Sequence, residues 1–96
     1  MAEIYYCLRS KQDGRYLIAH PQPDREAASY LLLFREDFES LSYLKTHAHQ
    51  VADRWTIESL STSQLSSLLE RWGFQGIGIV HDPLLPQIEF LRLHHE

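Results

Sequence analysis

Six histidines in a chain of 96 residues raise the question of a metal site. His47 and His49 are two residues apart, and on a helix this spacing directs their rings about 200° away from each other. His94 and His95 form a second pair. The sequence holds no Cys-x-x-Cys, His-x-x-x-His or His-Glu-x-x-His pattern, although structural zinc requires four well-placed ligands. We therefore expect neither a metal site nor a cofactor.

His81 and Asp82 form another candidate pair, a histidine beside a carboxylate. A carboxylate that orients the ring would let the histidine act as a general acid or base. The pair follows the short apolar run Gly76 to Val80, which predicts an interior strand. In the alternative interpretation, Asp82 forms the turn before Pro83 and His81 faces water. The sequence offers no obvious nucleophile to work with the pair.

Ligands of an open sheet with parallel strands bind beyond the carboxyl ends of those strands. His81 and Asp82 end one predicted strand, Ser61 and Thr62 follow another, and Arg35 follows a third. If these strands are neighbours, the five side chains converge on one edge, which we call the predicted rim. A helix amino terminus near Thr62 adds N–H groups that suit an anion. The rim is therefore a candidate site for a small molecule or an anion.

The elements that position the rim centre on one unit of strand, helix and strand. Trp55 to Leu60 mixes aromatic, β-branched and polar residues, which is typical of a strand. Ser61 and Gln64 have the spacing of a capping box, with Thr62 or Ser63 as alternative caps. Apolar residues at i, i+3, i+4 and i+7 then predict a helix that a glycine ends. These residues are Leu65, Leu68, Leu69, Trp72 and Gly73.

Three more strands are expected in the first third of the chain. Ile4 to Leu8 is aromatic and aliphatic, and Arg15 to Ala19 follows it after Asp13-Gly14, the strongest hairpin signal in the sequence. His20 to Asp24 contains two prolines and is expected to be a loop. Leu31 to Phe34 is apolar on both faces, which predicts a buried central strand.

A second helix is predicted to start at Arg35 to Asp37, and a last strand covers Ile88 to Leu93. The order of elements is then β-β-β-α-β-α-β, with the last strand added at the end. We expect an α+β fold, a two-layer sandwich in which a mixed sheet of five or six strands carries both helices mainly on one face. The apolar positions of the second helix are Phe38, Leu41, Leu44, Ala48 and Val51.

Composition limits the class of protein. Ninety-six residues suit one domain, residues 1–96, with a single modest core. The net charge is −4 and no basic cluster occurs, which argues against a nucleic-acid partner. The sequence shows no signal-peptide pattern and no apolar run of membrane-spanning length, so we expect no membrane association. Cys7 is the one cysteine and lies in an apolar stretch, which predicts a buried thiol and a cytoplasmic protein.

Two stretches resemble known groups of proteins. Tyr30 to Phe38, a strand that ends in Leu-Phe and passes into an acidic helix start, resembles the pattern of SseB-like domains. Leu68 to Phe74, together with Asp82 to Gln87, is similar to a family of small cyanobacterial proteins. Both resemblances imply a small α/β domain, and neither implies catalytic residues.

The missing catalytic constellation favours a function other than catalysis. The sheet face without helices must be covered by tyrosines of this chain or by a second copy, and tyrosine is common at interfaces. Tyr5, Tyr6 and Tyr43 are the candidate interface residues. We expect a protein-interaction or regulatory module that forms a homodimer. The alternative is a small-molecule or anion binder, or an enzyme, that acts through the rim around His81 and Asp82.

Overall fold

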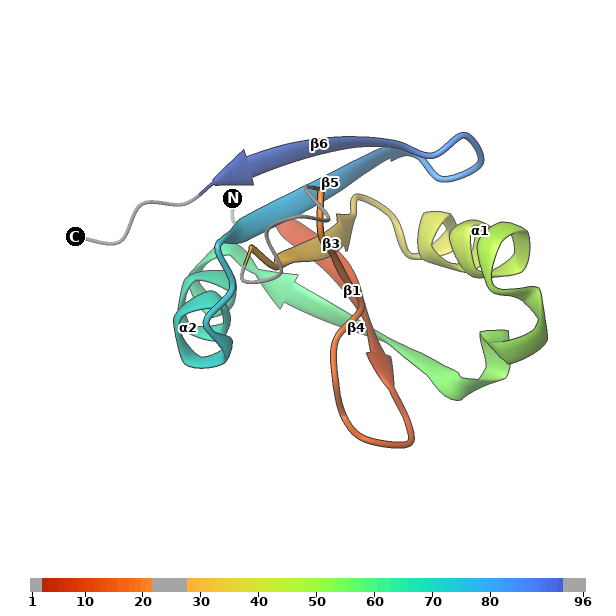
Figure 1. Ribbon diagram of the computed structural model, residues 1–96, viewed down its shortest axis with the longest axis horizontal. Helices are drawn as coiled ribbons and strands as arrows, with labels where there is room; N and C mark the ends of the chain where they lie inside the picture. Colours follow the sequence, from red (N-terminus) through yellow and green to blue (C-terminus); the bar gives the residue numbers. More distant parts are fainter. Residues whose placement is uncertain (1–2, 22–27, 93–96) are drawn as a thin grey trace.

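The computed structural model describes residues 3–21 and 28–92, which form one mixed sheet and two α-helices (Figure 1). These elements confirm the predicted α+β class and the predicted order of strands and helices. His94, His95 and residues 22–24 of the predicted loop lie outside the described residues. The strands are β1 (Ile4–Ser10), β2 (Ile18–Ala19), β3 (Tyr30–Phe34), β4 (Trp55–Ser61), β5 (Gly76–Asp82) and β6 (Gln87–Arg92). The helices are α1 (Asp37–His47), the 3-10 helix η1 (His49–Arg54) and α2 (Thr62–Trp72).

Helix α2 is capped at both ends as its sequence predicts. The Oγ of Ser61 accepts the N–H of Gln64 at 3.3 Å, and the Gln64 side chain accepts the N–H of Ser61 at 2.9 Å. This reciprocal pair satisfies two N–H groups near the start of the helix, where partners within the helix are lacking. After Trp72, Gly73 takes φ +72°, a left-handed conformation that costs glycine little.

Helix α1 meets the sheet through a narrower face than its sequence predicts. Ser40 and Leu44, one turn apart, are buried. Phe38 and Leu41 are 61% and 47% exposed, because they lie beside this line of contact rather than on it. The predicted apolar stripe does not continue as one helix to Val51, since α1 ends at His47 and η1 follows. Two large apolar side chains of α1 therefore remain in contact with solvent.

The strand order β4-β1-β3-β5-β6 places β1 between β3 and β4, and β2 pairs with β3. Strand β1 is antiparallel to both β3 and β4, and β5 is parallel to β3, so β3, β4 and β5 run in the same sense through the sheet. The chain crosses from β3 to β4 through α1 and crosses back from β4 to β5 through α2. Because such crossovers are right-handed in nearly all proteins, two that run in opposite directions place their helices on opposite faces.

The packing of the two helices shows that they cover opposite faces of the sheet. This arrangement differs from the expectation that both lie mainly on one face. Leu65, Leu68 and Leu69 of α2 pack on one face, which we call the α2 side. Leu44 of α1 packs on the other, the α1 side. In Figure 1 the strands lie between the two helices. Alternate residues of β3 supply both cores: Leu31 and Leu33 on the α2 side, and Leu32 and Phe34 on the α1 side.

Two groups of strands make up the sheet. Strands β1 and β4 pair over their full lengths, and β3, β5 and β6 form the second group. The groups meet at the pair Tyr6–Phe34. Leu17 strengthens this junction, because its N–H donates to the carbonyl of Leu8 at 2.9 Å and its carbonyl accepts the N–H of Leu32 at 3.2 Å. The two groups run in clearly different directions in Figure 1, so the sheet turns sharply between them.

Candidate functional site

The structure does not gather the predicted rim residues into one cluster. Phe34 lies opposite Val80 on one side and Tyr6 on the other, so β3 and β5 end at the same level. Strand β1 separates this point from β4, with Ile4 opposite Ser61. In Figure 1, β4 ends beside α2, whereas β5 ends on the other side of the molecule. The inserted strand and the sharp turn of the sheet thus divide the rim.

His81 and Asp82 are both engaged with nearby groups. The Nε2 of His81 lies 2.8 Å from the Oε1 of Glu89 on the neighbouring strand, and the two form an ion pair when the ring is protonated. The Oδ1 of Asp82 accepts the N–H groups of Leu84 at 2.9 Å and of Leu85 at 3.3 Å. Asp82 therefore holds the β5–β6 turn, which is the structural role that its place before a proline also suggested.

The other rim residues lie in separate surroundings. Ser61 caps α2 and Thr62 is the exposed first residue of that helix. Arg35 lines a shallow hollow of about 270 Å³ with Glu3, Ile4 and Tyr5. The hydroxyl of Tyr5 donates to Glu3 at 2.7 Å, and this bond, together with burial, raises the pKa of Tyr5. The carboxylate of Glu3 shares the hollow with Arg35, which weakens the attraction of Arg35 for an anion.

The three candidate interface tyrosines are all half-buried, and they lie on opposite faces of the sheet. Tyr5 packs against the core on the α2 side, whereas Tyr6 and Tyr43 pack against the core on the α1 side. The ring of Tyr43 lies 5.4 Å from that of Phe34 and 4.7 Å from that of His47, measured between centroids. Burial raises the pKa of Tyr43. All three rings thus contribute to the cores of this chain.

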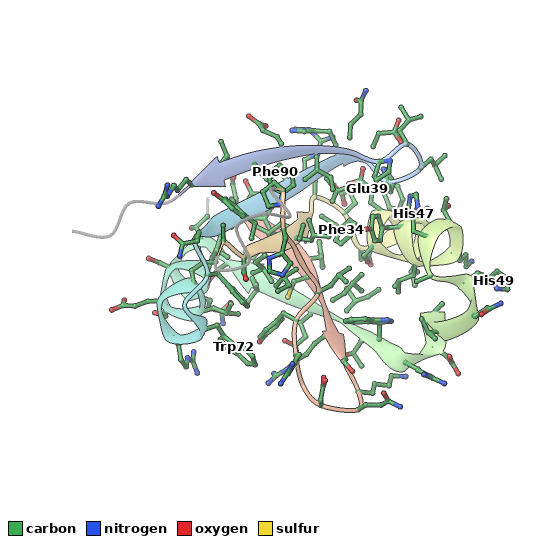
Figure 2. The ribbon with its side chains drawn as sticks, in the orientation of Figure 1. Phe34, Glu39, His47, His49, Trp72 and Phe90 are labelled. Atoms are coloured by element: carbon green, nitrogen blue, oxygen red, sulfur yellow. The ribbon has the colours of Figure 1, made fainter. Side chains whose placement is uncertain are left out.

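The two histidines at the end of α1 occupy different positions. The Nε2 of His47 lies 2.8 Å from the carbonyl oxygen of Pro83 and so connects α1 to the β5–β6 turn. His49 is exposed in η1, and Figure 2 shows it at the outer margin of the molecule. Within residues 3–21 and 28–92, no three His, Cys, Asp or Glu side chains are placed to hold a metal ion.

A charged and aromatic cluster on the α2 side has no motif in the sequence. The Nε of Arg9 donates to the carbonyl of Gly14 at 2.8 Å, and its Nη1 lies 3.6 Å from the Oε2 of Glu58. The guanidinium lies 4.9 Å from the centroid of the Tyr16 ring, which Trp72 meets edge-on at 5.2 Å. Burial, followed by the charge of Glu58, raises the pKa of Tyr16. The cluster connects the loop after β1 with β4 and α2.

A hollow of about 350 Å³ lies beside this cluster along α2. Ser63, Ser67 and Arg71 line it at i, i+4 and i+8, over the apolar side chains of Leu60 and Leu68. The spacing of the three polar residues is the signal that the sequence offers for this hollow. The same spacing is typical of any solvated helix face, so the pattern alone does not indicate a site.

Exposed apolar side chains concentrate on the hairpin formed by β5 and β6. Leu84 and Leu85 in its turn are 61% and 68% exposed, and Phe90 and Leu91 on β6 are 36% and 40% exposed. We call these four residues the hairpin surface; Figure 2 labels Phe90 on the uppermost strand. They account for half of the eight large apolar side chains that are exposed in the described part of the chain. Two leucines between two prolines are the sequence signal for this surface.

Strand β6 is also an edge of the sheet. Among the described residues it pairs with β5 alone, from Gly76–Arg92 to Asp82–Gln87. Its other side therefore presents a row of backbone N–H and C=O groups. The structure thus combines exposed apolar side chains with exposed backbone groups on the same strand.

Comparisons with protein-family models, with curated proteins and with solved structures give no match for this chain. None of the helices in the described residues has the length and apolar character that crossing a membrane requires.

Proposed function

We propose that this protein is a non-enzymatic interaction or regulatory module that works as a homodimer and docks through the hairpin surface. The observation that carries this proposal is the concentration of Leu84, Leu85, Phe90 and Leu91 on one hairpin. Apolar side chains gathered on a surface and surrounded by polar ones are characteristic of interaction sites. A second copy docked along this hairpin would cover part of this exposed apolar surface.

The state of the reactive side chains supports a role other than catalysis. His81 is paired with Glu89, and Asp82 holds a turn. Cys7 is fully buried, and burial raises its pKa to about 12, so the thiol does not ionise at neutral pH. We place the module in the cytoplasm, where a single buried thiol stays reduced. The net charge of −4 makes another protein a better partner than a nucleic acid.

Sedimentation equilibrium and native mass spectrometry on the whole chain test this proposal. We expect a species of twice the 11.3 kDa chain mass that dissociates on dilution. A measured mass equal to that of two chains alone supports the interaction module. An additional mass that matches a metabolite would favour a ligand-binding function. A chain that stays monomeric up to submillimolar concentration, and that captures no protein partner, would contradict the proposal.

Substitution of an exposed leucine tests the surface itself. Leu91→Ser removes one exposed apolar side chain of the hairpin surface from each copy, and we expect the Kd of the dimer to rise at least about tenfold, or roughly 1.4 kcal/mol. Leu41→Ser on α1 is the matched control, because Leu41 is similarly exposed and lies outside the hairpin surface. An equal effect of both changes would mean that the hairpin surface has no special role.

A further inference from the structure

Among the described residues, strand β6 carries few of the features by which proteins usually protect an edge strand: Glu89 and Arg92 are charged, but no described element covers its outer side. Such strands commonly carry lysine or proline, point charges inwards, or are covered by another element. Between Gln87 and Arg92 there is neither lysine nor proline, and Phe90 and Leu91 are exposed on the two faces of the strand. The opposite edge, β4, exposes Thr56 and Ser59 instead. Of the two edges, β6 is therefore the one suited to pairing with a further strand.

We propose that a second copy of this chain adds its β6 antiparallel to β6, so that one sheet continues through both copies. This inference rests on the proposed homodimer and specifies its geometry. An antiparallel arrangement of two identical strands about a two-fold axis satisfies the exposed N–H and C=O groups of both edges at once. It also packs Phe90 and Leu91 beside side chains of the second copy on the two faces of the extended sheet.

The two faces of the strand restrict the register. A two-fold axis perpendicular to the sheet keeps each face of the sheet on the same side in both copies. Because directly opposite residues of antiparallel strands point to the same face, the axis must lie where one residue is opposite the same residue of the second copy. An axis at Glu89 sets two carboxylates directly opposite each other, which is unfavourable. An axis at Ile88 or at Leu91 leaves fewer of the described residues Gln87–Arg92 paired. The geometry therefore favours an axis at Phe90, which pairs Ile88–Arg92 of one copy with the same stretch of the other.

The surroundings of Phe90 suit this central position. Its ring meets that of Tyr30 edge-on at 5.5 Å on the α1 side of the sheet. A Cβ atom at Gly78 would lie only 3.0 Å from Phe90 and from Ile88, so the missing side chain leaves room for both. The Phe90 ring is thus already held in place before a second ring packs against it. Preorganisation of this kind lowers the entropy that association costs.

Side chains opposite each other in this register are compatible on both faces. On the α1 side, Arg92 lies opposite Ile88 of the second copy, where its aliphatic stem covers an apolar residue and its charged end reaches water. On the α2 side, Leu91 lies opposite Glu89 of the second copy. The Glu89 carboxylate lies 2.8 Å from the Nε2 of His81 in its own copy, and this contact fixes its direction.

A charge placed on the edge tests the pairing. Leu91 is 40% exposed, so Leu91→Lys is expected to fold, which circular dichroism checks. We expect the Kd of the dimer, measured by sedimentation, to rise at least about tenfold, since an edge lysine opposes strand pairing. Ser59→Lys places the same charge on the opposite edge and should leave the Kd unchanged.

Cross-linking tests the register independently. In a Cys7→Ala background, Phe90→Cys should be joined to its counterpart by a short bifunctional thiol reagent, because directly opposite Cβ atoms lie about 5 Å apart. Ser59→Cys on β4 is the control and should remain uncoupled. The edge pairing is wrong if the wild type is a dimer and Leu91→Lys dimerises just as tightly. It is also wrong if Phe90→Cys cross-links no better than Ser59→Cys. In both cases the homodimer itself stands. A monomeric wild-type chain overturns both proposals.

Discussion

Cys7 lies in the interior strand β1, where its surroundings decide its chemistry. It is fully buried in the core on the α2 side and lies opposite Glu58 in the neighbouring strand. Burial is the main cause that raises the pKa of Cys7 to about 12, and the negative charge of Glu58 adds to it. A thiolate is the nucleophilic form of cysteine, so this side chain is a packing residue. The sequence predicts this outcome, since Cys7 stands in an aromatic and aliphatic stretch.

The raised pKa of Cys7 predicts a pH dependence of stability. The thiol ionises near pH 9 in the unfolded chain and near pH 12 in the folded one, so its contribution is present below pH 9 and is lost as the pH rises towards 12. The loss approaches about 1.4 kcal/mol per pH unit once the unfolded thiol is ionised. Urea unfolding of the wild type and of Cys7→Ala between about pH 8 and about pH 10 measures this slope.

The alanine variant should be less stable than the wild type below about pH 9, and this difference should shrink as the pH rises, because the variant lacks the Cys7 part of the alkaline slope. A remainder persists, because the pKa values of Tyr5, Tyr16 and Tyr43 are raised as well and act in the same direction. Identical slopes in the two proteins would show that Cys7 ionises equally in the folded and unfolded states.

At the scale of elements, the residues that sequence predicts best are those whose signals are local. The boundaries of α2 follow from its cap, its apolar spacing and Gly73, and the structure confirms each of them. The predicted strand at Arg15 to Ala19 is reduced to Ile18–Ala19, because Tyr16 forms only an isolated bridge with Arg9. Phe38 follows helical spacing in α1 and is still exposed, since spacing does not show which line of the helix meets the sheet.

Features that depend on strand order are not contained in local signals. The division of α1 and α2 between two faces follows from the opposite directions of the two crossovers, from β3 to β4 and from β4 back to β5, which no motif indicates. The predicted rim also depends on strand order, because its residues converge only if β3, β4 and β5 are neighbours. The hairpin surface depends on how β6 and its turn lie at the edge of the sheet, and the local sequence around Leu84 and Leu85 does not show that both are exposed.

The cap of α2 gives a prediction for a single element. Ser61→Ala removes the acceptor for the N–H of Gln64, and we expect a loss of about 1 kcal/mol in the free energy of unfolding. Ser66 is exposed in the middle of the same helix, so Ser66→Ala is the matched control and should be neutral or slightly stabilising. Chemical denaturation measures both. A loss at Thr62→Ala in place of Ser61→Ala would assign the cap to the neighbouring residue.

At the scale of the whole molecule, side-chain packing connects the two groups of strands, whose backbones meet at few positions. The β1–β4 pair and the β3–β5–β6 group share the registered pair Tyr6–Phe34. The core on the α2 side nevertheless combines Cys7 and Leu60 from the first group with Leu31 and Ile77 from the second. The core on the α1 side does the same with Leu8, Leu32, Phe34 and Val80. Because β3 supplies both cores, loss of packing on one face should disturb the other.

Two tryptophans on opposite faces make this coupling measurable. Trp55 packs against the core on the α1 side, and Trp72 packs on Tyr16 and Phe74 on the α2 side. In Trp72→Phe the fluorescence reports the α1 side alone, and in Trp55→Phe it reports the α2 side alone. We expect the fluorescence transition of each variant to coincide with its far-ultraviolet circular dichroism transition, as in cooperative unfolding of one unit.

Removal of a buried side chain from one face completes the test of coupling. Leu69→Ala opens a cavity on the α2 side and should cost about 2–5 kcal/mol of unfolding free energy. If the cores are coupled through β3, this change shifts the transition of Trp55 on the far face by the same amount as that of Trp72. If it shifts Trp72 alone, the two faces unfold separately, and β3 does not couple the two cores.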